Sequence, residues 1–325
     1  MSSKKNYEAL LNEYKGNMFE FLVGHEFSKA FNLEQLYLDK TIQNIGSILE
    51  QQESFLRNYY PDLLIDLPLW AKELTKSFTE QYKLLGVTDI NLVGKSLAAA
   101  GDDSFNEADL LIHTQDCILP LSIKLAKYGS YVNTKSAGAK SFLLKHFSPF
   151  LTDIPNLQVD FNKYWESEFD ILAMQMHHEA GIEYLGGFTN WINEGLPTLP
   201  GELAPQFKTY LLSYYKRVNL KLYTILNELY LKDPDVFLAS LWGLKGLSNS
   251  ELIQVISFHR SHLKTKDGIN IMINSKSQKQ KYLEFKMNET NSEFVFEDSK
   301  LQLRLKPMNK FTSKSYKINC SVKYL

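Results

Sequence analysis

The chain has 325 residues, of which 44% are apolar and 13% aromatic, so it is long enough to build one large or two medium globular cores. Its formal net charge of −1 excludes a uniformly basic coat for nucleic acid, but the charge is unevenly distributed. Residues 264–325 carry 13 Lys and Arg against 6 Asp and Glu, so this segment is basic and the remainder of the chain is acidic.

Two features bear on the cellular compartment. The chain has only two cysteines, Cys117 and Cys320, which is too few for a disulfide framework. The N-terminus lacks a charged stretch followed by an apolar stretch, and no window approaches the roughly 18 uninterrupted apolar residues that a membrane span needs. We therefore predict a reduced, cytoplasmic protein without a membrane segment.

The first part of the chain has a helical period. Within residues 4–32 the side chains of Phe19, Val23 and Phe27 fall on one helical face, which we expect to be core, and Glu20 lies at the border of that face. Residues 33–85 continue the helical pattern, with a break at Pro61.

The period then changes. Three short apolar runs bounded by polar turns, residues 88–96, 107–114 and 118–126, predict a meander of strands. The second run carries Asp109 and the third carries Lys124, so adjacent strands would bring a carboxylate and an ammonium group together.

The second half of the chain is predicted to be helical first and β-rich afterwards. A helical period restarts at residues 136–147, and residues 150–263 are expected to form a helical region. From residue 264 to the end, short alternating runs predict antiparallel strands. In Leu301–Lys306 the basic residues Arg304 and Lys306 alternate with leucines, which predicts a basic sheet face; this face would either bind a polyanion or simply be solvated.

A helix with a glutamate, a strand, a strand with an aspartate, a strand with x-x-Lys and a second helix follow one another over roughly residues 15–147, with a helical insertion between the first helix and the sheet. In this order the chain resembles the PD-(D/E)XK nuclease superfamily, which includes many restriction endonucleases. The stretch from Gly16 to Glu20 matches the G-x-x-x-E of the family's first helix, Asp109 matches its aspartate, and Ser122-Ile123-Lys124 takes the place of (D/E)-x-K.

The resemblance implies an α+β, restriction-endonuclease-like mixed sheet flanked by helices, with a large helical insertion and a C-terminal antiparallel β segment. We therefore predict a nuclease core at residues 1–149, with the insertion at about 33–85, and the patterns of the later residues predict the helical region at 150–263 and the basic β-rich segment at 264–325.

The resemblance also implies a metal site that cleaves DNA. In the family the acids bind Mg²⁺ and the lysine supports the attacking water, roles that fall here to Asp109 and Lys124. Ser122 stands where the family has a second acid, and a hydroxyl is a poorer Mg²⁺ ligand than a carboxylate. Glu20 or Glu107 would have to supply the missing negative charge.

We expect double-stranded DNA as the partner, with a homodimer needed to cut both strands. A restriction role would add a partner DNA methyltransferase. Phosphate and base contacts are expected from the segment after Lys124 and from the basic sheet face, through the following residues: Asn133, Thr134, Lys135, Lys140, Lys145, Arg304 and Lys306.

Several alternatives stay open at this point. Ser122 also suits a non-catalytic nucleic-acid or protein-binding module with a degenerate nuclease fold, and nothing in the sequence distinguishes DNA from RNA. Glu284-Phe285-Lys286, with Asp267 upstream, is a second E-x-K sequence, for which an ordinary ion pair is the plainer interpretation. His177-His178 is expected to be a surface pair on a helix, because no further zinc ligands accompany it.

Overall fold

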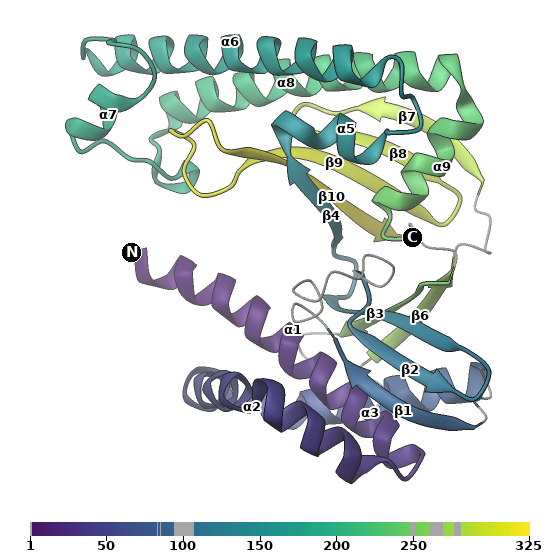
Figure 1. Ribbon diagram of the computed structural model, residues 1–325. Coiled ribbons are helices and arrows are strands. Elements are labelled where there is room, and N and C mark those ends of the chain that lie inside the picture. Colours follow the sequence, from purple (N-terminus) through teal and green to yellow (C-terminus); the bar gives the residue numbers. More distant parts are fainter. Residues whose placement is uncertain are drawn as a thin grey trace. The chain divides into compact units, whose positions relative to one another are not determined.

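The computed structural model describes residues 2–82, 84, 86–93, 107–247, 251–259, 269–275 and 281–325. In this part of the chain, helices accompany one five-stranded mixed sheet and one five-stranded antiparallel sheet, so the α+β class is confirmed. The chain divides into two compact units, Met1–Ser130 with Asn249–Gln278 and Tyr131–Ser248 with Lys279–Leu325, and Figure 1 labels their elements.

The helices of the first unit agree with the helical period of residues 4–85. They are α1 (Ser2–Ala30), α2 (Glu34–Tyr59) and α3 (Pro61–Tyr82). As predicted, one face of α1 is buried, and its members Phe19, Val23 and Phe27 are each at most 1% exposed. Phe27 meets Phe78 of α3 edge to face with ring centroids 5.5 Å apart, so α1 and α3 share one core.

The sheet of the first unit combines a meander with a parallel pair. Its strands, in spatial order, are β1 (Val87–Leu92), β2 (Leu110–Thr114), β3 (Ile118–Lys127), β5 (Ile253–His259) and β6 (Ile269–Ser275). β3 and β5 are parallel, whereas the other neighbours are antiparallel. The predicted three-strand meander is thus present at β1 to β3.

Two predictions about this sheet were wrong. Residues 251–259 were expected to be helical, but they contain β5, in which Ile253–Phe258 is buried without interruption. A strand buried on both faces reads as one continuous apolar run, which periodicity cannot tell from a buried helix. The neighbouring β6 was assigned to the C-terminal β segment, yet it pairs with β5 in the first unit.

The second unit packs helices on an antiparallel sheet. The sheet consists of β4 (Val132–Gly138), β10 (Tyr316–Tyr324), β9 (Ser299–Pro307), β8 (Ser292–Phe296) and β7 (Tyr282–Met287). Its helices are α5 (Phe142–His146), α6 (Ile154–Ala180), α7 (Thr189–Asn193), α8 (Pro205–Lys232) and α9 (Pro234–Leu244). α6 and α8 run side by side along this unit in Figure 1.

The segment after Lys124 differs from its prediction. The helix expected at residues 136–147 is shortened to α5, because residues 132–138 form β4, which pairs with β10 near the far end of the sequence. β4 and α5 belong to the second unit, so the chain divides at other places than the predicted boundaries at 149/150 and 263/264. Pairing over such a sequence distance leaves no local signal.

Two smaller predictions have opposite outcomes. The alternation in β9 is confirmed, since Leu301, Leu303 and Leu305 are buried whereas Arg304 is exposed. The expectation that His177 lies on a helix surface is wrong: its ring is fully buried, and Nδ1 is hydrogen-bonded to the carbonyl oxygen of Ala173 at 2.7 Å. Among the described residues, no helix has the length and apolar character to cross a membrane.

Candidate active site

The turn between β2 and β3 sets the register that builds the site. The Thr114 backbone N–H donates to the carbonyl oxygen of Cys117 at 2.9 Å, and the Thr114 hydroxyl accepts from the Cys117 N–H at 3.0 Å. In the resulting hairpin Leu110 lies opposite Leu121, and the backbone N–H of Asp109 donates to the Leu121 carbonyl at 2.7 Å. Asp109 is therefore held beside the Ser122-Ile123-Lys124 segment of β3.

Three donors converge on one carboxylate oxygen. Oδ2 of Asp109 accepts from the backbone N–H of Ile123 at 2.6 Å, from Nζ of Lys124 at 3.1 Å and, at a longer 3.4 Å, from the hydroxyl of Ser122. Hydrogen bonds to an ionised acceptor are stronger than neutral ones, so the carboxylate has one fixed position. The structure thus brings together Asp109, Ser122 and Lys124, as predicted.

These three side chains lie on one face of the sheet. Leu110, Leu121 and Ile123 belong to the core that α1 and α3 cover. Because successive side chains in a strand alternate between faces, the contacts of Asp109 with Ser122 and Lys124 lie on the face away from that core. The Lys124 side chain is 28% exposed and that of Asp109 is 15% exposed, so both can meet a ligand from solvent.

A row of buried amides extends the site across the sheet. Ser122 pairs with Gln254 on β5, which pairs in turn with Asn274 on β6, and all three are at most 6% exposed. Within the described residues, Nδ2 of Asn274 is buried without a hydrogen-bond partner. The sequence analysis missed this row. Its signal was visible, because Gln254 interrupts the apolar run 253–258 and Asn274 directly follows the run 269–273.

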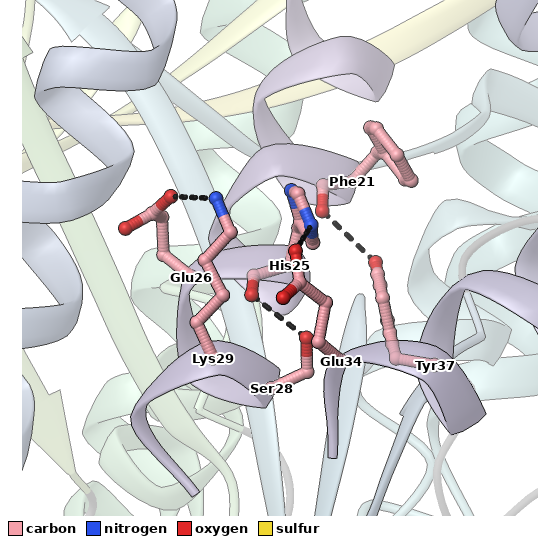
Figure 2. A network of polar contacts seen from close by, with 7 residues as sticks. All are labelled: Phe21, His25, Glu26, Ser28, Lys29, Glu34 and Tyr37. Atoms are coloured by element: carbon pink, nitrogen blue, oxygen red, sulfur yellow. Dashed lines mark hydrogen bonds and ion pairs between the residues drawn. The ribbon is translucent and has the colours of Figure 1, made fainter. Parts of the chain in front are cut away.

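The two other candidate acids lie on α1 and in the turn before β2. Glu20 lies on α1. Burial is the main cause of the raised pKa of Tyr37 on α2, and the negative charge of Glu20 raises this pKa further. Figure 2 shows other polar contacts between these two helices: the Tyr37 hydroxyl donates to the Phe21 carbonyl oxygen at 2.9 Å, and Nε2 of His25 lies 2.8 Å from Oε1 of Glu34. Glu107 is half-buried in the turn that precedes β2.

The donor set is sparse for a metal ion. In the part of the chain that the structure describes, no three His, Cys, Asp or Glu side chains form a metal-binding group. Mg²⁺ keeps several waters and is often held by only one or two carboxylates. The Asp109 carboxylate, with the neighbouring Ser122 hydroxyl, therefore fits Mg²⁺ as a site with a single described carboxylate.

The predicted nucleic-acid contacts do not share one surface. Asn133 lies on the same side of the second sheet as Arg304, because its Oδ1 accepts from Nδ2 of Asn319, which pairs with Arg304. Lys135 pairs with Cys320, the next residue along β10, and so points to the opposite side.

The remaining members of that set have other roles. The Thr134 hydroxyl donates to the Leu244 carbonyl at 2.6 Å, and Lys140 forms an ion pair with Glu166 at 2.6 Å. Burial, and then the charge of Lys145, lower the pKa of Lys135 to about 8. Lys306 remains beside Arg304. Burial has the largest effect in lowering the pKa of Lys306, and the charge of Arg304 lowers this pKa further.

The second E-x-K sequence agrees with its plainer interpretation. Lys286 and Glu284 of β7 form an ion pair at 2.5 Å, with side chains that are 45% and 53% exposed. Exposed pairs of this kind contribute little to stability. Asp267, its upstream acid, lies outside the described residues.

Comparison of the chain with known proteins identified no relative. No protein-family model, no curated protein and no solved structure matches the chain. The interpretation of the site therefore rests on its own residues and geometry.

Proposed function

We propose that this protein is a Mg²⁺-dependent nuclease that hydrolyses phosphodiester bonds in DNA, in a restriction or phage-defence role. The observation that supports this proposal is the pairing of the Asp109 carboxylate with the Lys124 ammonium group at 3.1 Å on adjacent strands. The order of a helix, three meandering strands and a lysine on the third agrees with the PD-(D/E)XK resemblance.

The side chains of the site divide the work between them. Asp109 would hold the cation, with Ser122 and Glu20 or Glu107 as further oxygen donors. When bound, Mg²⁺ polarises a phosphoryl oxygen and lowers the pKa of a coordinated water. Lys124 carries a positive charge next to Asp109, where it can orient the attacking water and stabilise the negative charge that develops on the phosphate.

The substrate and partners follow from the same proposal. Double-stranded DNA would be bound through phosphate contacts, among which Arg304 and Lys306 on the exposed side of β9 are the best placed. Cutting both strands would require two sites and therefore a homodimer. In a restriction system a DNA methyltransferase would protect the host sequence.

The test is cleavage of plasmid DNA with Mg²⁺ or with EDTA. Asp109→Ala and Lys124→Ala should each abolish nicking and linearisation while DNA binding in a gel-shift assay persists. Lys76→Ala changes an exposed lysine of α3 in the same unit and should leave cleavage unchanged. If Asp109→Ala and Lys124→Ala both still cut, the nuclease assignment is wrong.

A second function has its own supporting observation. Ser122 replaces the second acid, and the described residues contain no three-acid metal group, so a non-catalytic nucleic-acid or protein-binding module is the competing proposal. DNA binding without Mg²⁺-dependent cleavage would favour it. Running the same assay on RNA separates a ribonuclease from both.

A further inference from the structure

A cluster of cationic side chains lies in the first unit, at the ends of the parallel strands β3 and β5. Lys127, the last residue of β3, pairs with His259, the last residue of β5. The His259 ring is stacked on Trp70 of α3, with ring centroids 4.7 Å apart and an interplanar angle of 17°. Lys15 of α1 is close enough for its charge to act on the same imidazole. One helix and two strands thus bring two lysines and a histidine within electrostatic reach of one another.

The polar atoms of this cluster lack protein partners. Nε2 of His259 is buried and, within the described part of the chain, accepts or donates no hydrogen bond. Among the ion pairs between described residues, none includes Lys15 or Lys127. A buried polar atom without a partner costs free energy, so its retention here needs a reason.

The two lysine charges of the cluster likewise have no acidic partner among the described residues. Burial, and then the charges of Lys15 and Lys127, lower the pKa of His259 to about 4, so the imidazole is neutral near pH 7. A neutral imidazole can carry its proton on Nε2 and donate it. Burial also lowers the pKa of the half-buried Lys15. Two ammonium groups whose charges reach one imidazole, together with its N–H, match an anion with several acceptor oxygens.

We propose that Lys15, Lys127 and His259 form a phosphate-binding site. A phosphate offers strong acceptors to all three donors and neutralises both lysines, whereas a single carboxylate has fewer oxygens to distribute. The carboxyl ends of parallel strands are also a usual place for a ligand in mixed α/β sheets. The site does not depend on the nuclease proposal, since its residues are distinct from Asp109 and Lys124. The phosphate belongs either to a nucleic-acid backbone or to a free nucleotide.

The stacking of Trp70 on His259 provides a direct readout of binding. The fluorescence of Trp70 would be followed in EDTA, so that no cleavage occurs, during titration with inorganic phosphate, with dAMP and with a short single-stranded oligonucleotide. Trp70→Phe identifies the part of the signal that comes from this ring. Saturable binding of the oligonucleotide only assigns a backbone phosphate, and saturable binding of dAMP that is tighter than that of inorganic phosphate assigns a free nucleotide; both outcomes support the site.

Three variants test the residues themselves. Lys15→Met, Lys127→Met and His259→Phe, which keeps the stacked ring, should each weaken binding by about tenfold, the loss expected for one charge-assisted hydrogen bond. Lys76→Met removes an exposed lysine of α3 and should leave the affinity unchanged. The proposal is overturned if no probe saturates the signal, or if the three variants bind as the parent does, or if Lys76→Met loses as much.

The thermal stability of the unliganded variants separates binding from folding. Because Lys15 is half-buried and has no acidic partner among the described residues, Lys15→Met should melt at the same temperature as the parent or above it. A variant that binds weakly but melts normally has lost a ligand contact. A fall in melting temperature for Lys15→Met would show that the lysine stabilises the fold, which contradicts a site kept for a ligand.

Discussion

The carboxylate of Asp109 and the ammonium group of Lys124 lie 3.1 Å apart although each comes from a different strand of the β2–β3 hairpin. The same carboxylate oxygen accepts the backbone N–H of Ile123 at 2.6 Å, so the position of Asp109 is tied to the strand that carries the lysine. A carboxylate held in this way is already placed before any ligand arrives.

Replacing Ser122 by an acid should create a stronger metal site. Ser122→Asp would place a second carboxylate next to Asp109 at a position that is only 4% exposed. Without metal the two like charges repel, so we expect a loss of roughly 1–3 kcal/mol in unfolding free energy. Mg²⁺ should restore the melting temperature and bind more tightly than to the parent, as measured by calorimetric titration.

The control for that prediction is Ser122→Asn, which is similar in size but uncharged. It should show no Mg²⁺-dependent recovery of its melting temperature. Equal responses of the two variants to Mg²⁺ would show that no cation binds next to Asp109.

The basic side of β9 should contribute to the salt dependence of DNA binding. Arg304 is exposed. Burial is the main cause of the lowered pKa of Lys306, and the charges of Arg304 and Lys317 lower this pKa further. Arg304→Ala and Lys306→Ala should each weaken binding for all DNA sequences and reduce the slope of log affinity against log salt by about 1. Lys216→Ala on α8 serves as the exposed control. An unchanged slope in both variants would remove this surface from the interface.

A glycine of α1 should be required for the approach of α2. A Cβ built on Gly24 would lie 2.7 Å from Cζ of Tyr37, whose ring is 1% exposed and whose hydroxyl is bonded to Phe21. Overpacking costs about 1–3 kcal/mol, which exceeds the gain in helix propensity of about 1 kcal/mol from Gly to Ala. Gly24→Ala should therefore lower the unfolding free energy in urea.

Gly16 on the same helix is the matched control. No atom of the described residues lies within 4 Å of a Cβ at this position, so Gly16→Ala should stabilise the protein by up to about 1 kcal/mol. Stabilisation by both substitutions would mean that Tyr37 can move away at little cost.

Stability should rise with pH through the titration of Lys245. This lysine is fully buried, donates to the Ser299 hydroxyl at 2.9 Å and lies over the rings of Trp242 and Phe296. Burial lowers its pKa to about 8, while the charge of Asp298 acts in the opposite direction. Between pH 8 and the unfolded pKa near 10.4, the unfolded chain binds more protons than the folded one, so this group adds stability as pH increases.

The measurement compares the parent with Lys245→Met, which fills similar space without a charge. From pH 8 to pH 10 the unfolding free energy of the parent should gain about 1–2 kcal/mol relative to the variant. Other groups that titrate in this range are common to both proteins and cancel in the difference. Parallel curves would show that Lys245 titrates normally.

Short-range patterns predicted the parts of the fold that local chemistry decides. The buried face of α1 around Phe19, Val23 and Phe27 and the meander that carries Asp109 and Lys124 follow from residue periodicity and turn residues. The same reasoning failed at β5, since Ile253–Phe258 is buried on both faces and loses its alternation.

The sequence by itself determined that a carboxylate and a lysine would share two adjacent strands, because a tight turn at Thr114 leaves few registers open. Only the tertiary structure decided what surrounds them. The partner of Ser122 across the sheet is Gln254, and the partner of Lys127 is His259, both more than 130 positions away. Parallel pairing requires a long connection, here the whole Tyr131–Ser248 segment of the second unit, and no local pattern in the chain encodes which distant strand will fill that place.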